Sequence, residues 1–360
     1  MSTNREQLRT LLKHIVSYTE ECRMTATVGF DGCIDTILRP VRQRLSGSIP
    51  RYFETIAEFG AYLETKSGLS CAIEVEQVSR RFGGNGPNLA AALTTLGVKT
   101  ACVGNLGAPE PCFKGTGAEL YSVGGTGTCS ALQFSDGKVM LSNMQVADEV
   151  TFDSICAALG RETVQKLFCE NQGAAFVNWA EMPAATGIWR GIVEQFWAAE
   201  PPKRDRVLLV DLTDCSRRAE DEIREVADVC AKAGKYRRVV WSLNAGEAEL
   251  LAKHFRCPAA DAVSRAVQLR ISLSADVVVI HDIACCALSA PGTAVEVPGF
   301  PVEHPRISVG GGDTFNGALL FSLMCGFSPE ECALFAGAFS SAYVQMGTYI
   351  PLKQLYEQYN

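Results

Sequence analysis

Short apolar runs recur along the chain and alternate with longer segments that have helical spacing. An apolar run of four to six residues between polar or glycine-rich residues is typical of a strand buried on both faces. Such strands are predicted at 26–30, 100–103, 174–177, 207–210, 239–242 and 276–280. Helical periodicity predicts helices at 6–22, 88–96, 184–198, 219–233 and 247–254. This alternation indicates an α/β fold in which helices cover both faces of a parallel sheet.

Two stretches interrupt this alternation. The first, at about 36–82, contains basic residues, a predicted helix at 52–64 and a run of alternating polarity. The second, at about 119–143, contains two alternating runs around Asp136-Gly137, which is the pattern of a β-hairpin. We expect both stretches to form one small antiparallel sheet outside the main sheet, as a lid. No repeat or linker divides the chain, so residues 1–360 are expected to form a single domain.

Composition and charge exclude several classes of function. The chain has 33 Lys and Arg against 40 Asp and Glu, a net charge of −7, which does not favour nucleic acid or an anionic membrane. Fifteen cysteines, an odd number without C-x-x-C spacing, indicate reduced core residues. The charged N-terminus lacks the apolar stretch of a signal peptide. The uncharged stretch at 333–352 predicts a buried helix and a turn, so we expect a cytoplasmic protein without membrane spans.

Some of the 32 glycines gather where an anion could bind. Gly310, Gly311 and Gly312 precede Asp313 and a predicted helix at 315–325. Successive glycines let backbone N–H groups turn toward one point, and the helix N-terminus adds a positive dipole end. Asp313 could accept a proton from a hydroxyl while these amides stabilise a transferring phosphoryl group. The alternative is that the acidic residue only caps the helix and the glycines serve only the turn.

Two further turns precede predicted helices. Residues 83–88 read Gly-Gly-Asn-Gly-Pro-Asn, and their small side chains would let a ligand approach the backbone. A plain loop with an asparagine cap is the alternative there. Asn244 and Glu247 follow a predicted strand and could hold a phosphate and a hydrated Mg²⁺. A helix cap is the simpler interpretation of that pair when it is taken alone.

In this order, the motifs resemble those of the ribokinase/PfkB family of carbohydrate and nucleoside kinases. Members of that family have an Asp after the first strand, a GG-x-x-x-N loop, an N-x-x-E turn and a G-A-G-D-x-F-x-x-G loop near the C-terminus. The corresponding residues here are Asp35, 83–88, 244–247 and 310–317. The resemblance implies a Rossmann-like, three-layer fold with a small β lid, in agreement with the pattern of elements.

The resemblance also implies roles for single residues. Asp313 would be the catalytic base, and the amides of Gly310, Gly311 and Gly312 would form the anion hole. Asp35 would bind sugar hydroxyls, with Asp31 as a lower-ranked candidate. The remaining implied contacts are Gly84 and Asn88 to the sugar, Asn244 to the nucleotide, and Glu247 to Mg²⁺ through water.

Other candidates follow predicted strands at the edge where ligands bind in parallel sheets. Asn178 is expected to line the sugar site, and His281 the nucleotide site. Asp211 and Asp214 are further candidate ligands. The basic group Arg39, Arg42 and Arg44 is expected to form a solvated lid face, with contact to a substrate phosphate as the alternative.

The chain departs from the family pattern in three places, one of which is the loop after Gly104, where residues 105–109 replace the family's common G-D. Residues 307–309, Ile-Ser-Val, replace the start of the D-T-x-G-A-G-D motif, whose Asp often helps to form a monovalent cation site. Potassium dependence therefore stays open. Residues 281–286 lack the glycines that the family often uses beside the nucleotide, so the nucleotide pocket is expected to be unusual.

These observations predict an ATP-dependent, Mg²⁺-requiring kinase that phosphorylates a hydroxyl of a small sugar or sugar acid. A nucleoside kinase of the same fold and a catalytically silent sugar-binding member of the family are the alternatives, and ADP is an alternative donor because the nucleotide loop is atypical. We also expect a homodimer formed through the lid.

Overall fold

The computed structural model describes residues 2–19, 23–45, 47, 49–107, 111–307 and 309–359. Within them, nine strands form a large sheet in the order β14-β13-β12-β11-β10-β9-β1-β5-β6. Neighbouring strands from β12 to β6 are parallel, and β13 and β14 extend the sheet as an antiparallel edge. The bounds are β1 (Thr25–Phe30), β5 (Lys99–Gly104), β6 (Glu119–Ser122), β9 (Gly173–Phe176), β10 (Val207–Val210), β11 (Arg238–Asn244), β12 (Val277–His281), β13 (Cys285–Ala290) and β14 (Thr293–Pro298).

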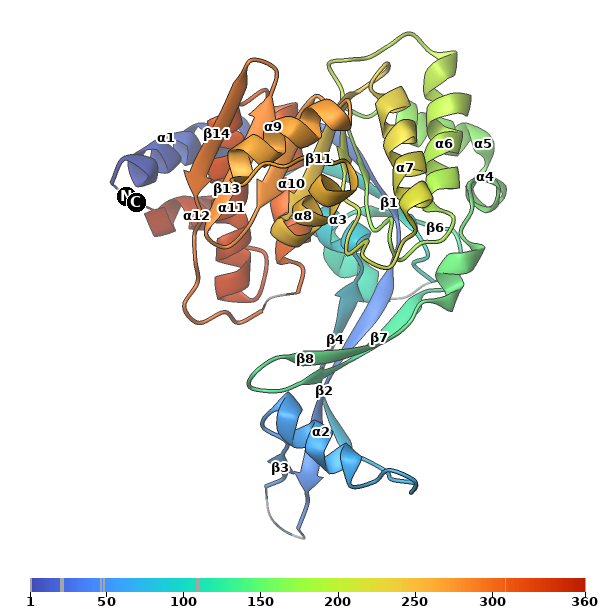
Figure 1. The fold of residues 1–360 in the computed structure, drawn as a ribbon, viewed down its shortest axis with the longest axis vertical. Coiled ribbons are helices and arrows are strands. Elements are labelled where there is room, and N and C mark those ends of the chain that lie inside the picture. Colours follow the sequence, from blue (N-terminus) through green and yellow to red (C-terminus); the bar gives the residue numbers. More distant parts are fainter. Residues whose placement is uncertain are drawn as a thin grey trace.

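Helices cover both faces of this sheet (Figure 1). On β10, Val207 and Leu209 join one hydrophobic core, and Leu208 and Val210 join the other, because successive side chains of a strand point to opposite faces. The first core includes α1 (Ser2–Thr19), α3 (Asn85–Thr95), α10 (Gly311–Met324), α11 (Pro329–Met346) and α12 (Leu352–Tyr359). The second includes α4 (Phe152–Leu159), α5 (Arg161–Cys169), α6 (Ala185–Gln195), α7 (Glu220–Ala233), α8 (Ala245–His254) and α9 (Ala262–Ser272). The predicted three-layer α/β fold is confirmed.

A second, small sheet projects from the body of the molecule (Figure 1). It contains β2 (Cys33–Gln43), β3 (Arg51–Tyr52), β4 (Val75–Gly83), β7 (Gly127–Gln133) and β8 (Lys138–Asn143), and α2 (Ile56–Glu64) lies at its far end. Its strand pairs are antiparallel except β2–β7, which is parallel. Phe53, Phe59, Leu132 and Phe134 form a small core of its own. We call this unit the small sheet.

The predicted elements agree with the observed ones except at some ends. The predicted lid segment at 119–143 includes β6, but β6 pairs with β5 and therefore belongs to the large sheet. The predicted hairpin is confirmed, with Gln133 paired to Lys138. Residues 20–22 of the predicted first helix lie outside the described residues. Among the described residues, no helix is long and apolar enough to cross a membrane.

Short 3₁₀ helices η1 (Pro111–Thr116), η2 (Gln145–Glu149) and η3 (Trp197–Ala199) complete the described elements.

Helices α3 and α10 pack closely because Gly317 lies between them. A Cβ atom added at Gly317 would lie 2.6 Å from the Cβ of Ala92 and 3.2 Å from the carbonyl oxygen of Leu89. Both contacts are with rigid parts of α3, so no larger residue fits at this position without moving a helix. This contact sets how near the two helix N-termini lie to each other.

We expect Gly317→Ala to lower the free energy of unfolding by about 1–3 kcal/mol, because the added methyl group forces α3 and α10 apart. Gly187→Ala is the matched control, since Gly187 also lies within a helix and an added Cβ there meets nothing within 4 Å. The control should be neutral or stabilising by up to about 1 kcal/mol. Urea unfolding of both variants measures the difference, and equal stabilities would contradict the close packing.

Candidate active site

Helix α10 begins in a glycine turn. Gly310 is its N-cap with a φ of 85°, in the left-handed region. A Cβ atom there would lie 2.9 Å from the hydroxyl oxygen of Tyr343, so both the backbone and the space favour glycine. Gly311 and Gly312 form the first turn of the helix, whose free N–H groups have no partner within the helix. The turn thus offers free N–H groups of the kind that bind an anion. We call residues 310–312 the anion loop.

Asp313 follows the anion loop and is buried. Asn88 Nδ2 donates to its Oδ2 at 3.3 Å, and the hydroxyl of Tyr349 donates to the carbonyl oxygen of Asn88 at 3.0 Å. Burial, and then the nearby carboxylates of Asp211 and Asp31, raise the pKa of Asp313 well above its usual range. A carboxylate with a raised pKa is a stronger base once ionised, as removal of a hydroxyl proton requires.

Asp31 connects the loop at 83–88 to the large sheet. It is fully buried, and it accepts hydrogen bonds from the backbone N–H groups of Asn85 and Gly86 and from Asn178 Nδ2, each at 2.8 Å. A Cβ atom at Gly84 would lie 2.7 Å from Asp31 Oδ2, which explains the glycine there. Gly84 and Asn178 thus both lie against Asp31, the lower-ranked of the two candidate sugar-binding carboxylates.

Asp35 lies in the small sheet rather than in the turn after β1. It is buried, and its Oδ1 lies 2.5 Å from the position that a Cβ of Gly83 would occupy. Burial raises the pKa of Asp35, while the cations Arg81 and Lys138 lower it. Asp35 thus belongs to a charged cluster on the small sheet, and Asp31 belongs to the edge of the large sheet.

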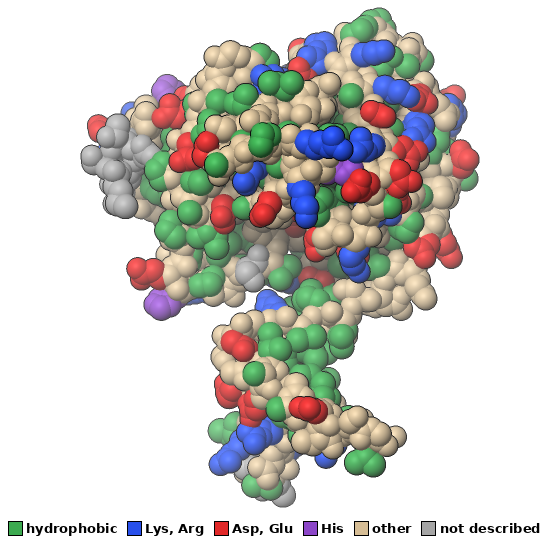
Figure 2. All heavy atoms as spheres, in the orientation of Figure 1, with side chains coloured by type: hydrophobic (Ala, Val, Ile, Leu, Met, Phe, Trp, Pro, Cys, Tyr) green, Lys and Arg blue, Asp and Glu red, His purple; other side chains and the backbone are tan. Residues whose placement is uncertain are grey.

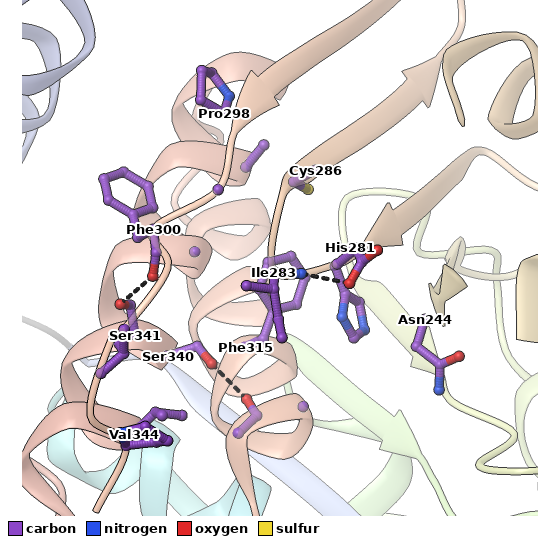
Figure 3. A pocket seen from close by; sticks show the side chains of 18 residues that line it. Asn244, His281, Ile283, Cys286, Pro298, Phe300, Phe315, Ser340, Ser341 and Val344 are labelled. Atoms are coloured by element: carbon purple, nitrogen blue, oxygen red, sulfur yellow. Dashed lines mark hydrogen bonds between the residues drawn. The ribbon is translucent and has the colours of Figure 1, made fainter. Parts of the chain in front are cut away.

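A cavity of about 480 Å³ opens beside the anion loop (Figure 3). Gly311 and Gly312 line one end, together with Asn244 and His281. His281 lies against Phe315, with ring centroids 4.4 Å apart. Burial lowers the pKa of His281 to about 4, so its ring is neutral near pH 7. The other lining side chains include the apolar Ile283, Pro298, Phe300 and Val344. An apolar cavity next to an anion-binding turn suits a base and its phosphates.

Asn244 and Glu247 cap α8 reciprocally. The Asn244 side chain accepts from the N–H of Glu247 at 2.9 Å, and the Glu247 carboxylate accepts from the backbone N–H of Asn244 at 2.9 Å and from its Nδ2 at 2.6 Å. Burial, and then the charge of Asp211, raise the pKa of Glu247 to about 8. Burial raises the pKa of Asp211 to about 6, and Asp211 accepts from the N–H of Thr213 at 2.7 Å. The motif therefore serves as a cap and also places a second acidic group near Asp211.

The basic residues of the small sheet pair within it. Arg42 bonds Glu58, and Arg44 Nε donates to Glu74 at 2.7 Å. The guanidinium of Arg39 lies 3.7 Å from the ring centroid of Tyr52. Acidic and basic side chains are interspersed on this part of the surface (Figure 2). These contacts favour the solvated face over a phosphate site.

The structure brings most of the predicted residues to one edge of the large sheet and adds others. Asn316 Nδ2 donates to Asp211 Oδ2, one turn of α10 beyond Asp313. Its helical spacing of three from Asp313 was the available signal. Arg81 and Tyr343 gave no such signal, because their approach to the site depends on the pairing of the small sheet and on the packing of α11. Ser308, in the departing motif, lies outside the described residues.

Comparison with known proteins gives the family. A family model described as prokaryotic ketohexokinase matches residues 3–359. The chain belongs to the prokaryotic ketohexokinase family. It is 26% identical over 329 residues to a ketohexokinase from Haloferax volcanii, a match that covers 89% of this chain and 86% of the relative.

Solved structures show the same fold at low sequence identity. Ribokinase from Thermotoga maritima is 16% identical with a TM-score of 0.63, and the match covers 93% of this chain and 98% of that one. A putative ribokinase II from E. coli, in complex with ATP and Mg²⁺, is 13% identical with a TM-score of 0.65, covering 94% and 99%. The predicted ribokinase-like fold is thus confirmed. This member of the ketohexokinase family is an ATP-dependent sugar kinase, a phosphotransferase with an alcohol group as acceptor.

In this ketohexokinase-family chain, Asp313→Asn should lower kcat by about 10²–10⁴-fold, the range expected when a general base is lost. Because the pKa of Asp313 is raised, the native state binds its proton more tightly than the unfolded state does. Asp313→Asn, whose side chain cannot ionise, should therefore have a Tm near pH 7 equal to or higher than that of the unaltered enzyme. In the unaltered enzyme, kcat/KM should rise with pH as Asp313 loses its proton, above the pH usual for an Asp.

Asp214→Asn is the control, because Asp214 is exposed and its carboxylate accepts from the backbone N–H of Ser216 at 3.0 Å. A pH–rate profile and a melting curve for each variant make the comparison. Turnover of Asp313→Asn near that of the control would show that another group removes the proton.

Proposed function

We propose that this protein transfers the γ-phosphoryl group of ATP to a hydroxyl of a ketohexose. The observation that carries the proposal is the family match, which covers nearly the whole chain together with the anion loop and Asp313. Buried polar atoms at the sheet edge support a sugar as acceptor. Among the described residues, Asn178 Oδ1, Asn316 Oδ1 and both amide atoms of Asn105 have no hydrogen-bond partner. Sugar hydroxyls both donate and accept, so a bound sugar would satisfy such atoms.

The proposed reaction is a direct displacement. Asp313 accepts the proton of the acceptor hydroxyl, and the oxygen of that hydroxyl forms a bond to the γ-phosphorus. The bond from the γ-phosphorus to the bridging oxygen breaks, and ADP leaves with that electron pair. The N–H groups of the anion loop and the dipole of α10 stabilise the charge on the phosphoryl oxygens. Since phosphoryl transfer depends mostly on position and charge, these few groups are sufficient.

Mg²⁺ fits the acidic pair beside the cavity. Asp211 and Glu247 are hard oxygen donors, and each has a raised pKa because it is buried near other negative charge. Among the described residues, no group of three or more acidic, His or Cys side chains could hold a metal ion directly. We therefore propose that Glu247 and Asp211 hold Mg²⁺ through its water molecules. The ion would neutralise charge on the phosphates of ATP.

The small sheet is proposed to act as a lid and as a dimer surface. Asp35 is the residue through which this sheet would reach the site. Closure of the sheet over the site would exclude water, which could otherwise hydrolyse ATP. Its strands expose apolar side chains, including Val78, Met140 and Leu141. Such side chains support a homodimer through this sheet. A solution mass of only 38.8 kDa would contradict the dimer.

A panel of acceptors tests the function. With MgATP, release of ADP should be stimulated by fructose or another ketohexose at least about tenfold more, in kcat/KM, than by glucose or adenosine. That difference corresponds to about 1.4 kcal/mol of discrimination at a site built for one arrangement of hydroxyls. Glucose is the matched control for the position of the carbonyl group, and adenosine tests the nucleoside-kinase alternative. Turnover of glucose or of adenosine equal to or better than that of fructose would overturn the ketohexose assignment.

The metal proposal is tested at Glu247. Glu247→Gln should raise the Mg²⁺ concentration needed for half-maximal activity by about tenfold, the usual effect of losing an indirect metal contact. Glu249→Gln lies on the same helix, and its side chain is exposed, so it serves as control. An activity titration with MgCl₂ at fixed ATP gives the comparison. An unchanged Mg²⁺ requirement in Glu247→Gln would remove this residue from the metal site.

A further inference from the structure

The small sheet presents two cations on the face that carries Asp35. Arg81 of β4 pairs directly with Asp35 of β2, so their side chains share one face of the sheet. The registers of β2 with β7 and of β7 with β8 place Lys138 on this same face. Arg80 alternates to the opposite face, where its Nη1 donates to Cys112 Sγ at 3.4 Å. Two neighbouring arginines of one strand therefore have different surroundings.

Arg81 lies on the side of the small sheet that meets the anion loop. The hydroxyl of Tyr343 donates to the carbonyl oxygen of Val309 and lies beside Gly310. The charges of both Arg81 and Asp313 act on this hydroxyl. Burial raises the pKa of Tyr343, Arg81 lowers it, and Asp313 raises it. The Nε atom of Arg81 is itself buried and makes no hydrogen bond. A donor of Arg81 is thus available close to the catalytic carboxylate.

The chemistry of the site calls for a cation at this place. None of the described residues that line the cavity beside the anion loop is Lys or Arg. On the large-sheet side, the buried acidic groups Asp31, Asp211 and Asp313 repel a phosphate. A ketohexose carries no charge, so the anion to be neutralised is the phosphoryl group in transfer. A planar guanidinium with several N–H donors matches the oxygens of such a group.

We propose that Arg81, with Lys138 beside it, binds the transferring phosphoryl group from the small-sheet side and stabilises its charge in the transition state. The anion loop then holds the same group from the α10 side. Arg81 acts only as a donor and a charge, and it neither gives nor accepts the proton that Asp313 removes. That Arg81 binds the phosphoryl group and not the acceptor rests on the proposed function, in which the acceptor is an uncharged ketohexose.

Arg81→Met should lower kcat by about 10²–10³-fold, as expected for loss of one preorganised donor to a developing charge. The KM for fructose should change less than about threefold, because interactions made only in the transition state leave ground-state binding intact. Arg80→Met is the matched control on the same strand and should stay within about twofold of the unaltered enzyme, within the spread of surface changes. Added guanidinium ion should restore part of the activity of Arg81→Met and none to Arg80→Met.

Binding of a phosphoryl mimic separates a catalytic role from a structural one. With MgADP and fructose, aluminium fluoride should raise Tm of the unaltered enzyme beyond the effect of MgADP alone. Arg81→Met should lose this added shift and keep the shift caused by MgADP. If Arg81→Met does not fold, Arg81→Lys carries the test, because it keeps a charge but not the planar donor pair. A drop in kcat of at least about tenfold with an unchanged Tm then supports the proposal.

Three results would overturn it: an unchanged kcat in Arg81→Met or Arg81→Lys, a retained fluoride-dependent shift, or a raised KM for fructose at unchanged kcat. The last result would place Arg81 on the acceptor. If the unaltered enzyme does not phosphorylate fructose, the ketohexose assignment fails by itself. The fluoride-dependent shift, measured with MgADP and without sugar, still decides the role of Arg81 in that case.

Discussion

The close contact of α3 with α10 is the constraint on which the site depends. Each helix begins in a glycine turn at the same edge of the large sheet, and Gly317 lets the two axes approach until Asn88 reaches Asp313 at 3.3 Å. The first turn of each helix then faces one region, so the positions of the free N–H groups of α10 and of the Asp313 carboxylate depend on a single packing contact. Side-chain chemistry at this edge follows from how two helices fit together.

That arrangement concentrates negative charge in a buried place. The carboxyl groups of Asp31, Asp211, Glu247 and Asp313 are all buried, and burial raises the pKa of each. Hydrogen bonds from Asn and backbone N–H groups offset part of this cost, as at Asp31, which has three donors. The rest is relieved when a proton or cation is bound, in agreement with the proposed Mg²⁺ at Asp211 and Glu247 and with Asp313 as the proposed base. Stability is given up here for function.

Much of the fold could be predicted from the sequence because its signals are local. Apolar runs define the strands, and the glycine turn before Asp313 defines its helix start, whatever the rest of the chain does. Such local signals could not decide which of Asp35 and Asp31 lies at the edge of the large sheet. Both carboxylates follow β1 within a few residues, and only the path of β2 away from the large sheet separates them. The position of Arg81 opposite Asp35 depends on strand register, which no short motif encodes.

The connection between the two sheets links these pieces. β1 leads into β2 through Asp31 and Gly32 alone, and Cys33 of β2 pairs with Gly83 of β4 and with Gly127 of β7. All three strands therefore enter the small sheet at one level, beside glycines. Asp31 sits at this junction and also holds the N–H groups at the start of α3. Asp31 therefore ties the start of α3 to the point where the small sheet leaves the large one, so the angle between the two sheets and the position of α3 depend on the same carboxylate.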